Sequence, residues 1–241
     1  MTSARARQMP TMVVLDLDDT LYAYEPCNRA AHSAMVALAA AETKLAPAAI
    51  SEALSTARAT VKSRLGATGS SHSRLLYAYE ALAALGFGNQ LRLALNMEQE
   101  FWRTYILEMR LRPGAAELLT AVRYQHVRIA VVTDLTSQIQ YRKLVHLGLD
   151  SVVDLVVVSE ECAGDKSSLA PFRALAERTS PDARRNVWFV GDGPADAPVS
   201  RLIDEGLIDD GFGWILGGAA DEYHDGWSSL SEVEAAFTST F

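Results

Sequence analysis

Three aspartates fall within four consecutive positions at the end of an apolar run, in the stretch VVLDLDDTLY at residues 13–22. Asp16, Asp18 and Asp19 repel one another at this spacing, and each must be hydrated or paired. Aspartate is also common in turns and at helix N-termini, so the cluster alone fits either a structural turn or a reactive site. As a reactive site, it would offer acid–base groups and oxygen ligands for a hard cation.

Polar residues also follow three later apolar runs. RIAVVT ends in Thr133, LVVVS leads within a few residues to Lys166, and VWFVG runs into Asp192 and Asp196. In open α/β sheets, ligands bind beyond the carboxyl ends of the strands. Singly, these residues would be a strand threonine, a surface lysine and a helix N-terminal acid. Together, each after a strand, they indicate one catalytic edge.

On these residues, the sequence resembles the haloacid dehalogenase superfamily, whose members are mostly phosphohydrolases. The DxDxT signature of that family corresponds to DLDDT at 16–20, and its closing Ser or Thr corresponds to Thr133. Its lysine corresponds to Lys166 in GDKSSLAPF, and its acidic pair to Asp192 and Asp196 in GDGPAD. The first and fourth strands are neighbours in this family, which would bring the acids of both motifs into one crevice.

The resemblance implies covalent catalysis. Asp16 would attack phosphorus and form an aspartyl-phosphate. Asp18 would protonate the leaving alcohol and then activate the water that hydrolyses the intermediate. The Thr133 hydroxyl would bind phosphoryl oxygens, and Lys166 would neutralise charge on the phosphate and on Asp16.

The resemblance also implies a Mg²⁺ cofactor. Four carboxylates in one crevice need a hard cation, and oxygen ligands with retained waters suit Mg²⁺. The implied metal ligands are Asp16, the backbone carbonyl of Asp18, Asp192, and Asp196 directly or through water. Asp19 is expected instead to hydrogen-bond local amides and to shape the turn with Thr20.

The sequence departs from the family pattern at several positions. Asp134 follows Thr133 where the family more often has Asn, which places a carboxylate near the phosphate and makes Asp134 a candidate substrate contact. Ser167 replaces the proline that commonly follows the lysine, and Ala197 and Pro198 stand where another acid and an apolar residue are frequent. None of these changes removes an essential group.

The apolar pattern predicts the elements that position this chemistry. Nearly continuous apolar runs, as expected for parallel strands covered on both faces, lie at 12–17, 128–133, 155–159, 187–191 and 212–216. The intervening segments AAELLTAVRY, SQIQYRKLVHLG and APFRALAER have helical periodicity. The alternation predicts an α/β fold with a Rossmann-like, doubly wound parallel sheet, as in the core of the haloacid dehalogenase family.

The interval between the first two strands breaks this rhythm. It is rich in good helix formers, and its apolar spacing predicts helices near 28–43, 48–65, 72–86 and 89–108. We therefore expect a mobile tail at 1–10, a core formed by 11–22 and 111–241, and a helical insertion at 23–110. The insertion resembles the helical C1-type cap of one branch of the superfamily, which would close over the site and read the leaving group.

The loop GATGSSHSR at 66–74 is a candidate for specificity. His72 and Arg74 could meet an anion or sugar hydroxyls, although a polar loop between helices needs no substrate. Tyr22, Tyr24 and Glu25 are expected near the entrance to the site.

Composition excludes several classes of protein. The net charge of −8 argues against nucleic-acid binding, and an anion site must then be built locally. Cys27 and Cys162 are read as reduced thiols. No apolar run reaches the ~20 residues that span a bilayer, and the N-terminal stretch lacks the apolar region of a secretory signal. A cytoplasmic location without membrane partners is expected, and the sequence does not determine the oligomeric state.

The leading hypothesis is a Mg²⁺-dependent phosphomonoesterase acting on a small phosphorylated metabolite. A phosphomutase or phosphotransferase, which passes the phosphoryl group to a sugar hydroxyl, is the alternative that the sequence barely separates. A dehalogenase needs neither a metal nor an acid at Asp18, so Asp18 argues against that activity. A catalytically idle binding protein is disfavoured by the intact set of motif residues.

Overall fold

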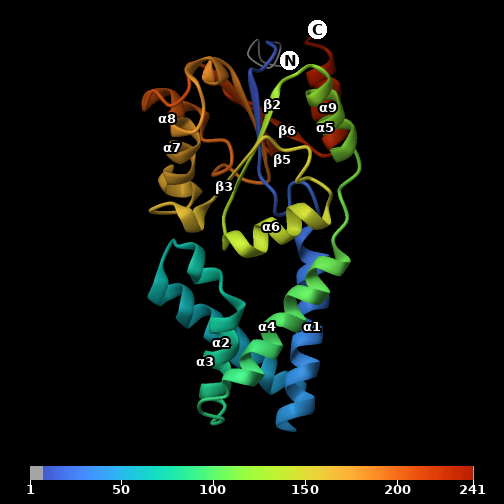
Figure 1. Ribbon diagram of the computed structural model, residues 1–241, viewed down its shortest axis with the longest axis vertical. Helices are drawn as coiled ribbons and strands as arrows, with labels where there is room; N and C mark the ends of the chain where they lie inside the picture. The colour runs from blue at the N-terminus through green and yellow to red at the C-terminus, as the bar shows by residue number, and fades with distance from the viewer. Residues whose placement is uncertain (1–7, 241) are drawn as a thin grey trace.

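A computed structural model describes residues 8–240 and places a six-stranded parallel sheet at the centre of the core (Figure 1). The strand order is β3-β2-β1-β4-β5-β6. The strands are β1 (Met12–Leu15), β2 (Arg128–Thr133), β3 (Leu155–Val158), β4 (Val187–Gly191), β5 (Gly211–Leu216) and β6 (His224–Trp227). The predicted doubly wound parallel sheet is confirmed. The polar strand β6, with the sequence HDGW, was not expected from the apolar pattern.

The two faces of the sheet are covered by different helices. Val13 and Leu15 of β1 belong to one apolar core, and Met12 and Val14 belong to the other, because successive strand residues face opposite sides. The first core includes α5 (Ala115–Tyr124), α6 (Ser137–His146) and α9 (Leu230–Thr238); the second includes α7 (Ala170–Glu177) and α8 (Val199–Asp204). Figure 1 shows α5 and α9 on one side of the sheet and α7 and α8 on the other.

Four long helices lie between β1 and β2 in the chain and form a layer beyond the carboxyl end of the sheet (Figure 1). They are α1 (Tyr24–Thr43), α2 (Pro47–Leu65), α3 (Arg74–Ala84) and α4 (Leu91–Glu108). We call residues 24–108 the helical module. Helix α1 begins four residues before the expected position, since Pro26 is tolerated in a first turn. Helix α3 begins later than expected, where the Ser73 hydroxyl caps the Leu76 amide.

The helical module packs against the core through α4 and the short 3-10 helix η2 (Gly69–His72), among other contacts. Helix α4 packs against α6, and η2 packs against η3 (Ser159–Glu161). A Cβ atom added at Gly69 would lie 2.7 Å from the carbonyl oxygen of Leu135. The loop at 66–74 therefore lies directly on the carboxyl ends of β2 and β3.

Most of the predicted N-terminal tail, residues 1–7, lies outside the described residues. At the start of the described part, the side-chain amide of Asn186 donates hydrogen bonds to the carbonyl oxygens of Gln8 and Met9 at 3.2 and 3.1 Å. Within residues 8–240, no helix by itself has the length and apolarity to cross a membrane; α1 and α2 together meet that test, across a bend of 117°.

Candidate active site

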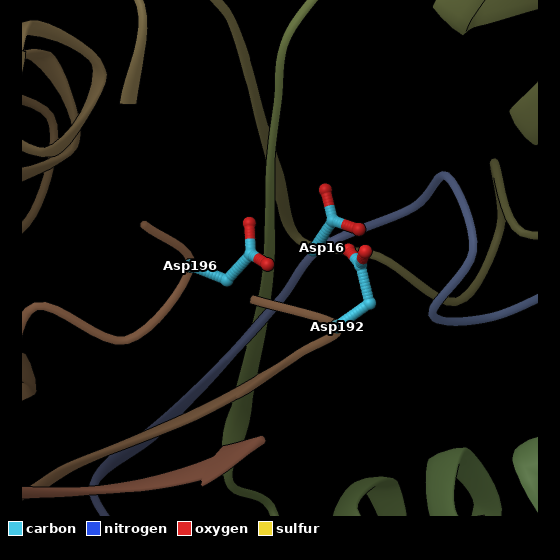
Figure 2. A group of neighbouring side chains, drawn as sticks. All are labelled: Asp16, Asp192 and Asp196. Carbon is cyan, nitrogen blue, oxygen red and sulfur yellow. The ribbon is translucent and has the colours of Figure 1, made fainter. Parts of the chain in front are cut away.

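Three carboxylates converge at the carboxyl ends of the two central strands (Figure 2). Asp16 follows β1 directly and Asp192 follows β4 directly, and these two strands are paired in parallel, as the family resemblance implied. Asp196 lies on the next turn. Each of the three acids offers an oxygen within 4.8 Å of those of the other two. Asp16 and Asp196 are buried, whereas Asp192 is exposed at the rim.

Lys166 joins two of these acids. It lies in the short 3-10 helix η4 (Lys166–Ser168), where Asp165 accepts a hydrogen bond from the Ser167 amide at 3.1 Å. The buried Lys166 ammonium donates to Asp16 Oδ1 at 2.6 Å and also to Asp196 Oδ1. Since one ammonium cannot balance three carboxylates, the fully ionised cluster keeps two negative charges.

The surplus charge appears in the pKa values of the cluster. Burial raises the pKa of Asp16 to about 8; Lys166 opposes this shift, and Asp196 adds to it. Burial and the neighbouring Asp196 also raise the pKa of Asp192 to about 6. Burial alone would lower the pKa of Lys166, but Asp16 and Asp196 outweigh it and raise that pKa. A site with this negative charge attracts cations. Because its acids are buried close together, their ionised forms are disfavoured in the absence of a cation.

The loop after β1 leaves the extended path, as the sequence indicated. Asp19 has a φ of 66°, in the left-handed region that Asp tolerates better than most residues. Its carboxylate accepts hydrogen bonds from the Tyr24 amide at 3.1 Å and from the Arg112 guanidinium at 2.7 Å. The buried Thr20 hydroxyl turns back and donates to Asp16 Oδ2 at 2.8 Å. Both carboxylate oxygens of Asp16 are thus oriented, one by Thr20 and one by Lys166.

Asp18 belongs to a second network, beside the acidic cluster. The Lys143 ammonium lies 2.7 and 2.8 Å from its two oxygens, and the Tyr22 hydroxyl donates to Oδ1 at 2.6 Å. Tyr22 also shares a hydrogen bond of 2.7 Å with the hydroxyl of Tyr105, on α4. This network connects the loop after β1 (residues 16–23), the core helix α6 and the helical module.

Lys143 and Gln140 were not expected from the sequence. Gln140 Nε2 donates to the Thr133 hydroxyl oxygen at 2.6 Å and to the Asp134 carbonyl at 2.8 Å. Both side chains are fully buried, three residues apart on α6, beside Leu144 on the same helix face. Polar residues on the apolar face of a helix need buried partners. Gln140 and Lys143 fall on that face in SQIQYRKLVH, which is the sequence signal that could have identified them.

The substrate candidates are not among the three converging acids. Asp134 Oδ1 accepts a hydrogen bond from the backbone amide of Lys166 at 3.2 Å, and burial raises the pKa of Asp134. Arg74 donates to the carbonyl of His72 at 2.8 Å and to the Tyr24 hydroxyl at 3.1 Å, both within the helical module. His72 is partly buried, and burial together with nearby cations lowers its pKa to about 4.

The sequence was compared with known families and proteins. The family described as haloacid dehalogenase-like hydrolase matches residues 10–203. Ribulose-1,5-bisphosphate 5-phosphatase of Halopiger xanaduensis is 37% identical over 198 residues, which cover 81% of this chain and 82% of that protein. Pyrimidine 5'-nucleotidase YjjG of Escherichia coli is 34% identical over 95 residues, 39% of this chain and 41% of that protein.

Solved structures share the fold at lower identity. The 2-haloacid dehalogenase of Pseudomonas syringae pv. tomato aligns with a TM-score of 0.72 and 19% identity, over 95% of this chain and 99% of that one. The HAD-hydrolase YfnB of Bacillus subtilis, whose structure has bound magnesium, aligns with a TM-score of 0.67 and 18% identity, over 96% and 99%.

Proposed function

This chain belongs to the haloacid dehalogenase-like hydrolases, and we propose that it is a Mg²⁺-dependent phosphatase that removes a phosphate group from a sugar phosphate. The observation that carries the proposal is the meeting of Asp16, Asp192 and Asp196 around Lys166 at the carboxyl edge of the sheet. The substrate class is taken from the 37% identical relative, a ribulose-1,5-bisphosphate 5-phosphatase.

The acidic cluster fits a hard divalent cation. Its donors are carboxylate oxygens within 4.8 Å of one another, the donor type that Mg²⁺ prefers. Asp16, Asp192 and the backbone carbonyl of Asp18 would hold the ion. Asp196, whose oxygens accept hydrogen bonds from Lys166 and from the Gly193 amide, would hold the ion directly or through water. When bound, the ion supplies positive charge against which a phosphate can approach these acids.

Asp16 acts as the nucleophile in this proposal. Thr20 and Lys166 hold its two oxygens in fixed directions, so little reorientation precedes attack. One carboxylate oxygen bonds to phosphorus as the ester bond breaks, and the electron pair of that bond passes to the alcohol oxygen. Lys166 remains beside the reacting oxygens and stabilises their charge.

Asp18 transfers the proton in both half-reactions. It gives its proton to the departing alcohol oxygen. In the second half-reaction it takes a proton from the water that attacks phosphorus, and the bond to Asp16 breaks. Lys143 and Tyr22 would fix the carboxyl group of Asp18 in place. The Thr133 oxygen accepts a hydrogen bond from Gln140, and its hydroxyl makes only a long contact of 3.5 Å to the Asp134 carbonyl, so the hydroxyl proton could be donated to a phosphoryl oxygen instead.

The fold does not separate this activity from its alternatives, since dehalogenases and a β-phosphoglucomutase from Thermotoga maritima (TM-score 0.58, 16% identity) share it. Analysis of the products distinguishes them, because only a phosphatase releases inorganic phosphate from a sugar phosphate in the absence of an acceptor sugar.

The decisive experiment measures phosphate release from p-nitrophenyl phosphate and from ribulose 1,5-bisphosphate, with Mg²⁺ and with EDTA. Turnover is expected only with Mg²⁺, and Asp16→Asn should abolish it. The control is Asp150→Asn, a surface aspartate outside the site, which should retain full activity. Turnover by the Asp16→Asn variant would rule out the nucleophile that we assign.

A further inference from the structure

A pocket of about 490 Å³ lies within the helical module, among α1, α2, α3 and α4. Its volume is in the range of small-molecule sites. Two guanidinium groups line it, those of Arg58 and Arg74, together with the hydroxyls of Ser51, Ser55 and Tyr24. One acid, Glu25, also lines the pocket, where it is exposed to solvent. The lining offers several hydrogen-bond donors and an excess of positive charge.

Arg74 has no acidic partner. It is only 8% exposed, and within residues 8–240 neither Arg74 nor Arg58 forms an ion pair with a carboxylate. The Arg74 guanidinium instead lies 4.9 Å from the ring centroid of Phe101 and 5.3 Å from that of Trp102. Aromatic faces offset part of the cost of burying a cation, but a buried charge ordinarily needs a counter-ion. The fold therefore leaves room for an anion that the chain does not supply.

Neighbouring groups respond to this positive charge. Burial, with further contributions from Arg58 and Arg74, lowers the pKa of Lys62. Burial and Arg74 also lower the pKa of His32, which lines the pocket. In a chain with a net charge of −8, a local excess of positive charge is a specific feature of this part of the module.

Two chains of contacts connect the pocket to the loop after β1 (residues 16–23). Tyr24 donates its backbone amide to Asp19 and receives a hydrogen bond from Arg74 at its hydroxyl. Trp102 lies 5.3 Å from Arg74 and 5.5 Å from Lys143, the partner of Asp18, measured to its ring centroid. One residue, Tyr24, thus separates the buried arginine from Asp19, and two residues, Trp102 and Lys143, separate it from Asp18.

We propose that this pocket binds the second phosphate of a sugar bisphosphate while the first phosphate reacts at Asp16. The inference rests on the proposed function and narrows its substrate class to bisphosphates. Guanidinium groups offer paired donors that match phosphate oxygens, and the serine and tyrosine hydroxyls supply further donors. A monophosphate would leave Arg74 without a counter-ion, so the site would favour bisphosphates over monophosphates.

The test compares two substrates that differ only in the second phosphate, ribulose 1,5-bisphosphate and ribulose 5-phosphate. We expect kcat/KM to be higher for the bisphosphate by about tenfold or more, the size of one or two charge-assisted hydrogen bonds. Arg58→Ala should raise KM for the bisphosphate by about 10- to 100-fold and leave p-nitrophenyl phosphate turnover unchanged. Arg58 is exposed, so its removal should not unfold the chain.

Arg64→Ala is the matched control, because Arg64 lies on the same helix but is exposed and paired with Glu80 at 2.7 Å. It should leave KM for both substrates unchanged. Binding is measured separately by titrating ribulose 1,5-bisphosphate into the Asp16→Asn variant with Mg²⁺, alone and combined with Arg58→Ala or Arg74→Lys. Thermal unfolding shows whether the buried Arg74 variant is folded.

The outcomes separate this inference from the proposed function. If p-nitrophenyl phosphate is hydrolysed but the two sugar phosphates have equal kcat/KM, or Arg58→Ala binds the bisphosphate as tightly as its parent, the second-phosphate site is wrong and the phosphatase assignment stands. If Asp16→Asn retains turnover, the proposed function fails. Loss of bisphosphate binding in both arginine variants, with the fold and the Arg64→Ala control intact, supports the inference.

Discussion

The ammonium group of Lys143 lies 2.7 and 2.8 Å from the two carboxylate oxygens of Asp18. Lys143 is fully buried, and the rings of Tyr22, Trp102 and Tyr105 lie within 5.8 Å of its ammonium. Burial lowers the pKa of Lys143, and Asp18 opposes this shift. A buried ion pair contributes little to stability compared with apolar residues of the same size, so we expect this pair to serve by holding Asp18, the proposed proton-transfer group, in place.

Lys143→Met tests that role. The substitution keeps the length of the side chain and removes the charge that orients Asp18. We expect kcat to fall by about 10- to 100-fold, in the range of a positioned acid–base group, with KM for p-nitrophenyl phosphate unchanged. Tyr22→Phe, which removes only one hydrogen bond to Asp18, should have a smaller effect. An unchanged kcat in the Lys143→Met variant would show that this pair does not position the proton donor.

Gly191 is required by the close approach of Asp196. A Cβ atom at residue 191 would lie 2.1 Å from Cβ of Asp196, whereas at Gly193 the nearest atom would be 3.7 Å away. Neither glycine has a positive φ, so the comparison isolates steric space. Gly191→Ala should destabilise the protein by about 1–3 kcal/mol, as overpacking does, and should greatly reduce Mg²⁺-dependent turnover. Gly193→Ala should change neither; equal effects in the two variants would contradict this steric account.

Asp192→Asn and Asp134→Asn test which of these two acids is a metal ligand. Asp192 is one of the three converging acids, whereas the carboxylate of Asp134 accepts the backbone amide of Lys166. Asp192→Asn should raise the Mg²⁺ concentration for half-maximal activity by about 10- to 100-fold, as expected when a metal site is impaired. Asp134→Asn should leave that concentration nearly unchanged. The reverse order would show that the metal lies on the Asp134 side of the site.

Mg²⁺ binding should strengthen as pH rises. Without metal, the pKa values of Asp16 and Asp192 are raised to about 8 and about 6, so protons must leave these acids before they ligate. Affinity should increase from pH 5 to about pH 8 and then level off. Titration calorimetry at a series of pH values measures this dependence, and an affinity that falls over this range would contradict the assignment.

The raised pKa values of Asp16 and Asp192 also determine how the stability of the metal-free protein changes with pH. Between the ordinary pKa of 3.8 and the raised values, the folded chain binds more protons than the unfolded chain, so metal-free stability falls as pH rises. Saturating Mg²⁺ binds the ionised acids of the folded state and reduces this loss. The difference in melting temperature between samples with Mg²⁺ and with EDTA should therefore widen from pH 5 to pH 8. A constant difference would indicate that these acids do not hold the ion.

Parts of this architecture could be predicted because they depend on local pattern. Buried parallel strands are nearly continuous apolar runs, and the five expected strands, β1 to β5, were placed within two residues of their bounds in the structure. Acids placed after β1 and β4 must meet once those strands pair, so Asp16 and Asp192 could be expected together. The strand β6 was not predicted because HDGW is short and polar. A strand at the edge of the sheet is less buried and therefore needs fewer apolar residues.

Side-chain direction is the part that the sequence did not provide. Arg74 was expected in a loop between helices, but it is the first residue of α3, and its guanidinium lies among aromatic rings of the helical module. Tyr105 reaches Tyr22 across 83 residues of sequence, which no local pattern encodes. Lys143 gave a weaker signal, because it is a lysine on the apolar face of its helix. That pattern indicates a buried partner but does not identify it.

Gly69 sets how near the helical module approaches the sheet. It lies against the carbonyl oxygen of Leu135 and against Glu160, with no space for a methyl group. Glycine at residue 69 therefore allows the helical module to approach the sheet closely, and a side chain there should move the module away from the carboxyl ends of β2 and β3. A larger side chain at this position would therefore be expected to open the carboxyl edge of the sheet to water.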